Sequence, residues 1–464
     1  MAIKQVQVEV DSLVLGMYVS RLDRPWSQTP FTLQGFYLRS PREIIQLQNY
    51  CHHVFIDIQK GRAPLDSVAP PVTSPQRKNT QYQALGRSAA RANARLIKKD
   101  KVQSAPAPIV VRKGFYETRT ALRKEAAQAK KIVGRLKGTL TLVVKQMNRG
   151  RTVDYGRLKD SVGDMVESVL RCPDAFTWLM RLREQDERSY DHSLRSALWA
   201  VQYARYIGMP KDEIDVLCMG TLLKDVGKAK LSSRLLRKEN RSEVEEKEYR
   251  KHVTYGVELL RQTRQVEPRV ISVVRYQAER NDGSGYPEGL SGGKIPLLAR
   301  VAGIASTYDR ICFSRDGSEP LAPSRAVSVL YGMRDKQFSD DLVVSFIQSI
   351  GLYPTGTLVE LTTGDIGVVT EQHPKSRLTP KVAVLGREDI DLTAAVTVVD
   401  LKNDEKTRDA LGANTGKGFF DRVAIARDLE PGGYDVDLSK IAHLFIAKEL
   451  GGPKSLFSGW LKRH

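Results

Sequence analysis

The sequence feature that most constrains the fold is a long series of helical patterns in the middle of the chain. Residues 118–147 are rich in Ala, Arg, Lys, Leu and Val and contain no proline, which favours one long helix. Residues 155–171 repeat apolar side chains at helical spacing, and Pro173 ends that pattern and begins the next. Helical patterns continue to about Gly351 without an alternating strand pattern. We therefore predict an all-α domain within residues 113–350, with its core at about 185–350.

Different patterns flank this helical region. Residues 3–10 alternate as a strand, residues 40–43 have the cap, proline and acid of a helix start, and residues 54–57 form another strand. These features predict a small α/β module over residues 1–62. Beyond Gly351, turn residues separate short β-branched runs, and the last helical pattern begins at Asp437. We predict a small β-rich unit with a terminal helix over residues 351–464, in a multidomain and mainly α protein.

The positive charge of the chain is concentrated in one segment. The formal net charge is +19, and residues 77–151 supply 20 Lys or Arg against three acids, so +17 of it lies there. Residues 63–112 also contain two proline-rich stretches, which indicates a mobile, basic connector. Contact with nucleic acid or an anionic membrane surface is the alternative. Because no aromatic stacking platform interleaves the charges, we do not expect nucleic acid as a partner.

Several features indicate a cytoplasmic protein. No segment reaches the roughly 18 consecutive apolar residues of a membrane span, and the N-terminus lacks the apolar core of a signal peptide. The four cysteines lack paired spacing, so we expect reduced thiols. Residues 456–463 are apolar with basic flanks. Peripheral docking of this segment on a membrane or a partner stays open as an alternative.

Polar side chains recur at the ends of the apolar helical patterns. His192 and His252 each lie near a helix start, and Asp225 stands between Lys224 and Lys228 after an apolar helical run. A polar loop with two glycines and a proline follows at residues 279–287, and the helical pattern after it contains Ser306 and Asp309. Polar groups projecting from apolar helices in this way are typical of an internal pocket.

These residues resemble the HD-GYP domain, a helical metal-dependent phosphohydrolase that hydrolyses cyclic dinucleotides such as cyclic di-GMP. Residues 279–297 match the family's loop around Gly285, Tyr286 and Pro287, and residues 225–228 match the second half of its HD motif. The resemblance covers about residues 190–366. Residues 5–60 resemble the N-terminal domain of unknown function that often precedes HD-GYP domains. Together they imply a protein of bacterial second-messenger signalling with signalling proteins as partners.

The resemblance also implies where an iron or manganese pair would bind. The ligands of the first metal ion correspond to His192, Lys224, Asp225 and Ser306, and those of the second to Asp225, His252, Gln277 and Ala278. Each site loses two of four ligands, and the glutamate of trimetal members is replaced by Arg188. Lysine and alanine cannot replace imidazole or carboxylate donors. We therefore expect neither a bound metal pair nor hydrolysis; a residual single-metal site of His192, Asp225 and His252 is the alternative.

What the resemblance leaves in place is ligand binding. The family positions that contact the dinucleotide are occupied by Lys228, Asp309 and Arg315, beside the loop residues Gly285, Tyr286 and Pro287. Lys224 could supply positive charge where a metal ion would lie, or Lys224 and Lys228 could only brace Asp225. Two hypotheses follow: a cyclic di-GMP sensor or protein-interaction module without hydrolysis, and an active phosphodiesterase with unusual ligands.

Overall fold

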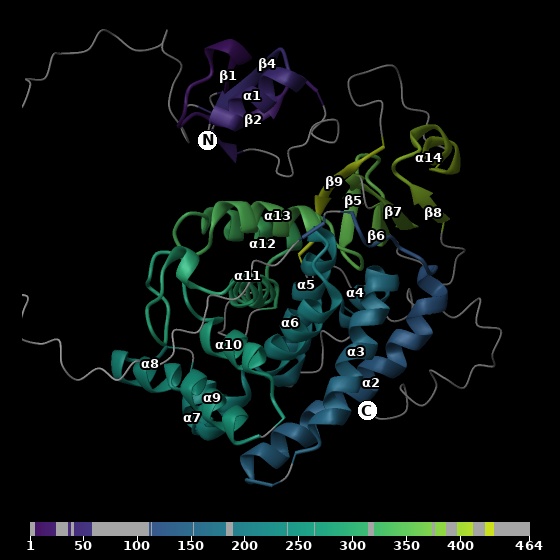
Figure 1. The fold of residues 1–464 in the computed structure, drawn as a ribbon. Helices are drawn as coiled ribbons and strands as arrows, with labels where there is room; N and C mark the ends of the chain where they lie inside the picture. Colours follow the sequence, from purple (N-terminus) through teal and green to yellow (C-terminus); the bar gives the residue numbers. More distant parts are fainter. Residues whose placement is uncertain are drawn as a thin grey trace, which may run out of the picture. The chain divides into compact units, whose positions relative to one another are not determined.

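The structure is a computed structural model, and it describes residues 5–24, 36–38, 41–57, 111–112, 114–151, 153–181, 189–238, 240–263, 265–313, 320–373, 376–386, 397–411 and 423–430. The described residues belong to two compact units, one that ends at Asp57 and one that begins at Val111. The predicted mainly α fold with flanking β elements is confirmed (Figure 1).

The N-terminal unit is a four-stranded antiparallel sheet with one helix. The helix is α1 (Pro41–Tyr50), and the sheet order is β1 (Gln5–Glu9), β4 (His53–Asp57), β2 (Tyr18–Leu22), β3 (Phe36–Tyr37). Apolar side chains on one face of the sheet are fully buried together with Leu47 of α1: Val19, Val54 and Ile56. This alternation of buried and exposed side chains is the period that the sequence predicts for strands.

The larger unit begins with three helices that pack as an antiparallel layer. They are α2 (Leu122–Asn148), α3 (Tyr155–Arg171) and α4 (Pro173–Arg181). The side chain of Asp154 accepts a hydrogen bond from the amide of Arg157 and so caps α3. Each of α2 and α3 buries one apolar face, as expected from the spacing of their apolar residues.

The remaining helices surround α11 (Leu297–Cys312), which lies near the centre of the helical part in Figure 1. All but a few of its side chains are buried, so it is the core of this unit. The helices around it and at its periphery are α5 (Ser189–Ile207), α6 (Lys211–Leu223), α7 (Ser233–Arg237), α8 (Glu243–Arg250), α9 (His252–Gln262), α10 (Pro268–Tyr276), α12 (Pro323–Gly332) and α13 (Asp340–Ile350).

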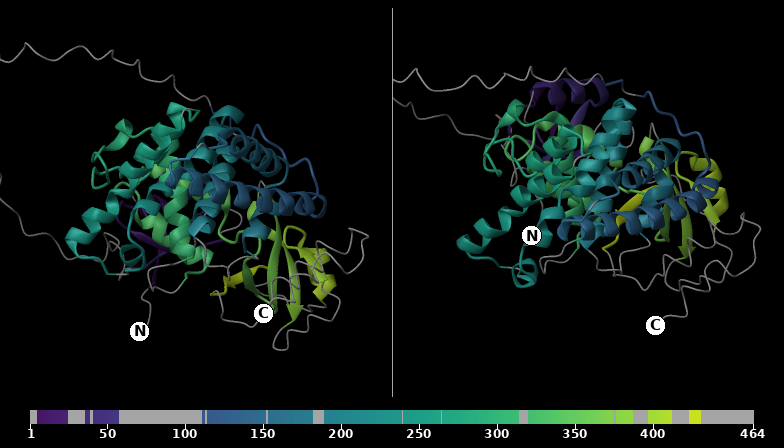
Figure 2. Two further views of the ribbon diagram at one scale, coloured as in Figure 1. Left: turned by 90° about the horizontal axis from the view of Figure 1, so that it is seen from below. Right: turned by 60° about the horizontal axis from the view of Figure 1, so that its bottom comes forward.

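A five-stranded antiparallel sheet follows and belongs to the same compact unit. Its strands, in the order of the sheet, are β8 (Thr397–Asp400), β7 (Ser376–Gly386), β6 (Ile366–His373), β5 (Leu358–Leu361) and β9 (Ile425–Asp428). Figure 2 shows these strands, coloured green to yellow, together at one end of the helices. The indole of Trp178 in α4 donates to the carbonyl of Thr370 in β6 at 2.9 Å, which fixes the sheet to the helices.

The sequence patterns missed two elements of this part. Helix α14 (Asp404–Leu411) and strand β9 were not predicted, whereas the predicted terminal helix at 437–450 lies outside the described residues, as do the apolar segment at 456–463 and most of the basic linker. The four cysteines are unpaired and buried, as expected. Among the residues that the structure describes, none of the helices combines the length and hydropathy needed to cross a membrane.

A buried carboxylate joins α2 to α3. Glu125 is 4% exposed and accepts hydrogen bonds from the hydroxyl of Ser168 at 2.5 Å and from Nη2 of Arg171 at 2.8 Å. Burial opposes ionisation of Glu125, but the hydrogen bonds from Arg171 and Ser168 outweigh it and hold its pKa below the usual value. The pair therefore stabilises the native state when Glu125 is ionised.

We predict that Glu125→Ala lowers the free energy of unfolding by about 2–4 kcal/mol at pH 7, because it leaves the Ser168 hydroxyl and the Arg171 guanidinium without their partner. The pKa of Glu125 is lower in the folded state than in the unfolded state. The difference in unfolding free energy between wild type and variant should therefore be complete above the pKa of the unfolded state and disappear as the pH falls through the pKa of the folded state. Urea unfolding at several pH values measures it. The control, Glu167→Ala, removes an exposed carboxylate 3.9 Å from the same arginine and should change stability by at most about 0.5 kcal/mol.

Candidate functional site

The centre of the candidate site is Asp225, whose carboxylate lies between two ammonium groups. Lys224 follows the last residue of α6 and forms an ion pair with Oδ2 of Asp225. Lys228, on the 3-10 turn after Asp225, places Nζ 2.8 Å from Oδ1. The side chain of Lys224 is 2% exposed and that of Lys228 is 27% exposed. One ammonium is therefore enclosed in the protein, and the other is accessible.

A second group of polar side chains connects α5 to α11. Nδ1 of His192 lies 2.7 Å from Oδ2 of Asp309, and Nε of Arg195 donates to Oδ1 at 2.9 Å. The indole N–H of Trp199 also donates to Oδ1, at 3.3 Å. Because a carboxylate only accepts, His192 must carry its proton on Nδ1, and Nε2 can then accept from the hydroxyl of Ser306 at 3.3 Å.

The second histidine lies on the other side of Asp225. His252 is the first residue of α9, and its Nδ1 donates to the carbonyl of Tyr249 at 2.7 Å. Its Nε2 therefore faces Oδ1 of Asp225, 4.0 Å away. The His252 ring lies between those of Tyr249 and Tyr286, with centroid distances of 4.9 and 6.2 Å. Tyr286 thus brings the 279–287 loop next to the acid centre.

Hydrogen bonds to one buried acid, Glu279, and close backbone contacts shape the 279–287 loop. The carboxylate of Glu279, 4% exposed, accepts from the amides of Glu288 at 2.8 Å and Leu290 at 2.9 Å. A Cβ at Gly285 would lie 2.3 Å from the amide nitrogen of Arg280, so only glycine fits. The same holds for Gly227, where a Cβ would lie 2.0 Å from the carbonyl oxygen of His252.

The ionisation states in the site follow from burial and from the two lysines. Burial lowers the pKa of His192 to about 3, with a further contribution from Lys224, and burial lowers that of His252 to about 4. Both imidazoles are therefore neutral at pH 7. Burial would raise the pKa of Asp225, but Lys224 and Lys228 outweigh it and hold that pKa well below its usual value. Near Asp225 the chain thus has one negative and two positive charges.

The residues at the positions implied for a metal pair do not fit two metal ions. The Asp225 carboxylate is shared by two ammonium groups, Ser306 donates to the free nitrogen of His192, and Ala278 has no donor atom. Gln277 is buried beside Ala278 and offers only an amide. The residual single-metal alternative also lacks support, because within the described ranges no three His, Cys, Asp or Glu side chains are grouped to hold a metal ion.

The expected ligand-binding residues lie in different environments. Lys228, Gly285, Tyr286 and Pro287 are partly or fully exposed around the Asp225 centre, whereas Arg315 and Arg188 lie outside the described residues. Asp309 is completely buried, and both of its carboxylate oxygens are hydrogen-bonded by side chains of α5. It positions His192, and its contact with a ligand stays a prediction.

Sequence reasoning missed the partners of Asp309 on α5. Arg195 and Trp199 follow His192 at intervals of three and four residues, so the three side chains lie on one face of the helix. An arginine on an otherwise apolar helical face was the available signal for a buried ion pair. What the pattern could not specify was that α11 supplies the acid.

Comparison with known proteins decides the family. The family model of a domain of unknown function, DUF3391, matches residues 5–158. The family model of the HD domain matches residues 179–342. A cyclic di-GMP phosphodiesterase of Pseudomonas aeruginosa is 30% identical over 398 residues, which are 85% of this chain and 88% of that protein. The chain belongs to the HD-GYP family.

Other relatives match a smaller share of the chain. A 3′3′-cGAMP-specific phosphodiesterase of Vibrio cholerae is 31% identical over 33% of this chain and 30% of its own length. The cyclic di-GMP phosphodiesterase response regulator RpfG of Xanthomonas campestris is 31% identical over 31% of this chain and 39% of its own length. The relatives thus belong to cyclic-dinucleotide signalling and are named for two different dinucleotides.

We predict unequal effects on stability for the two members of the buried pair in this HD-GYP chain. Asp225→Asn should lower the free energy of unfolding by about 3–5 kcal/mol, because it leaves the Lys224 ammonium buried without a counter-charge. Lys224→Met should change it by about 1 kcal/mol or less, because Lys228 still neutralises Asp225 and the buried ammonium is gone.

Urea unfolding of both variants measures the difference, with Asp164→Asn as the control. That substitution breaks an exposed ion pair to Arg135 and should cost at most about 0.5 kcal/mol. Equal losses for the two site variants would show that Lys224 and Asp225 do not have the unequal roles assigned here.

Proposed function

We propose that this chain binds a cyclic dinucleotide at the Asp225 site and does not hydrolyse it. The observation that carries the proposal is the enclosed ammonium of Lys224 beside Asp225. In this chain a lysine stands at a position where the resemblance to the HD-GYP domain implies a metal ligand. A fixed ammonium can attract a phosphate, but it cannot lower the pKa of a bound water as a divalent metal does.

The charges around Asp225 support an anionic ligand. Lys224 and Lys228 together exceed the single charge of Asp225, and both histidines are neutral. The positive charge of Arg310 also acts on Lys224 and Tyr286, where it works to lower the pKa. A cyclic dinucleotide has two phosphates, so its negative charge matches this excess of positive charge.

Aromatic and guanidinium groups beside the lysines support a ligand with bases. Nζ of Lys228 lies 5.7 Å from the centroid of the Tyr249 ring, and Cζ of Arg250 lies 5.0 Å from that of Tyr286. Both rings are only partly buried. Stacking on aromatic faces recognises bases, and the adjacent cations suit the phosphates.

We predict that cyclic di-GMP or 3′3′-cGAMP binds in the presence of EDTA, and that Lys228→Ala weakens binding about tenfold or more through loss of a charge-assisted hydrogen bond. Isothermal titration calorimetry measures both. The control is Lys230→Ala, which removes an exposed lysine from the same turn and should leave the affinity within about twofold. If neither dinucleotide gives heat at high micromolar concentration, the lysines only brace Asp225.

A separate prediction concerns hydrolysis. The purified protein should contain far less than one iron or manganese ion per chain, and it should release neither linear dinucleotide nor GMP from cyclic di-GMP when Mn²⁺ or Fe²⁺ is added. Metal analysis and chromatography of the nucleotides test this. Two metal ions per chain, or turnover that disappears in Asp225→Ala, would establish the alternative of an active phosphodiesterase with unusual ligands.

A further inference from the structure

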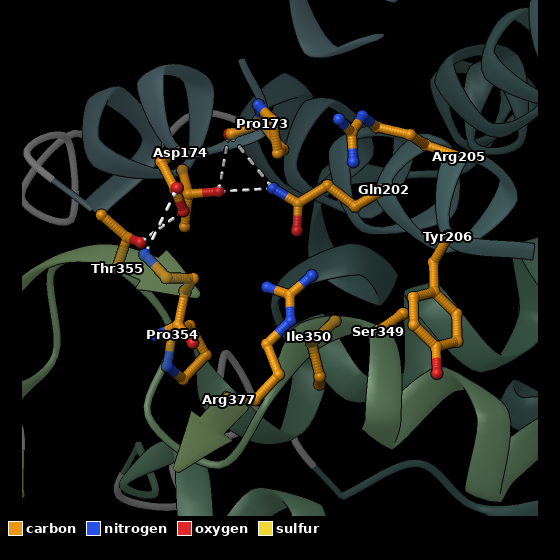
Figure 3. A pocket seen from close by; sticks show the side chains of 12 residues that line it. Pro173, Asp174, Gln202, Arg205, Tyr206, Ser349, Ile350, Pro354, Thr355 and Arg377 are labelled. Atoms are coloured by element: carbon orange, nitrogen blue, oxygen red, sulfur yellow. Dashed lines mark hydrogen bonds between the residues drawn. The ribbon is translucent and has the colours of Figure 1, made fainter. Parts of the chain in front are cut away.

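A small polar cavity lies where the helices meet the C-terminal sheet, at the opposite end of α5 from His192. Its volume, measured as the space open to the centre of a water molecule, is about 20 Å³. Side chains from α4, α5 and β7 point into it in Figure 3, among them Asp174, Gln202, Arg205 and Arg377. The cavity is therefore built from segments that are far apart in the sequence.

Two guanidinium groups and one carboxylate line this cavity, which leaves an excess of positive charge when Asp174 is ionised. Asp174 already accepts hydrogen bonds from the hydroxyl of Thr355 at 2.6 Å and from the amide of Gln372 at 3.4 Å. Nε of Arg205 donates to the carbonyl of Leu170 at 3.1 Å. The acid is thus held by two other lining residues of the cavity, and Arg205 is held by a carbonyl outside it.

Two lining residues, Arg377 and Gln372, each have a buried polar atom without a partner. Nε of Arg377 and Oε1 of Gln372 make no hydrogen bond, and no ion pair joins the guanidinium to any residue in the part of the chain that the structure describes. Figure 3 shows this guanidinium directed toward the middle of the cavity, near the amide of Gln202. Arg377 is partly buried, and a partly buried cation without an ion pair gains from a counter-ion, so a bound anion would stabilise this arrangement.

Burial and the like charges act in the same direction. Burial lowers the pKa of Arg377, and burial together with the charge of Arg377 lowers the pKa of Arg205. The charge of Arg377 thus disfavours the charged form of Arg205, whereas Asp174 favours the charged form of both arginines. An anion between them would remove this repulsion.

We propose that this cavity is a binding site for a small oxyanion such as inorganic phosphate, held by Arg377 and Arg205. Arginine presents several N–H donors in a fixed planar fork that matches the oxygens of phosphate or carboxylate groups. The volume excludes a nucleotide, so this site is separate from the proposed dinucleotide site. The amide of Gln202 donates to the carbonyl of Pro173 and to Thr177, which fixes the wall of the cavity next to Arg377.

The test is phosphate binding to the full chain and to Arg377→Met, which keeps the apolar stem and removes the charge. Thermal unfolding is followed in a buffer without oxyanions and with phosphate at increasing concentration, at constant ionic strength. Phosphate should raise the Tm of the wild type in a saturable manner, and Arg377→Met should weaken the apparent affinity about tenfold or more. Arg427→Met is the control, since it removes an exposed arginine from the same sheet and should leave the phosphate effect unchanged.

The unliganded proteins separate this proposal from a structural role of Arg377. Without oxyanion, Arg377→Met should be as stable as the wild type or more stable, because the unpaired, partly buried charge is gone. A variant that is less stable in every buffer, by the same amount with and without phosphate, would show that Arg377 only braces Asp174 and would overturn the proposal. A Tm of the wild type that does not respond to phosphate would show that the cavity holds water alone.

Discussion

The ion pair between Lys224 and Asp225 is the interaction on which the candidate site depends. The enclosed carboxylate is kept ionised by the ammonium beside it, and the two imidazoles around it stay neutral because they are buried. The cation is part of the chain, so it cannot dissociate or be exchanged. It supplies positive charge in a fixed place, but it has no open coordination position to activate a water molecule. In the function that we propose, binding is thereby separated from hydrolysis.

The groups around His192 and His252 orient the two imidazoles in the way that metal-binding histidines are usually oriented. Asp309 holds His192 through Nδ1, which is the support that ligating histidines usually receive from a second carboxylate or carbonyl. His252 is held in the same way by the carbonyl of Tyr249. The groups that orient the two histidines are thus present in this chain.

The sequence alone predicts those features that depend on neighbours along the chain. The helices follow from apolar spacing, and the contact of Lys224 with Asp225 follows from adjacency at the end of an apolar helix. The role of Asp309 could not be predicted, because it depends on how α11 packs against α5. Strand β9 was missed because its four residues include two charged ones, and it is a strand only through pairing with β5, far earlier in the chain.

Helix α5 contributes to two polar centres. The charges of one centre are paired, whereas the other contains a guanidinium without an ion pair to any described residue. Near its start, His192 and Arg195 take part in a network whose carboxylates are all neutralised by side chains of the protein. Near its end, Arg205 lies beside an arginine that has no partner in the cavity. The two centres are separated by about 20 Å of one helix. The same helix therefore positions side chains of both centres.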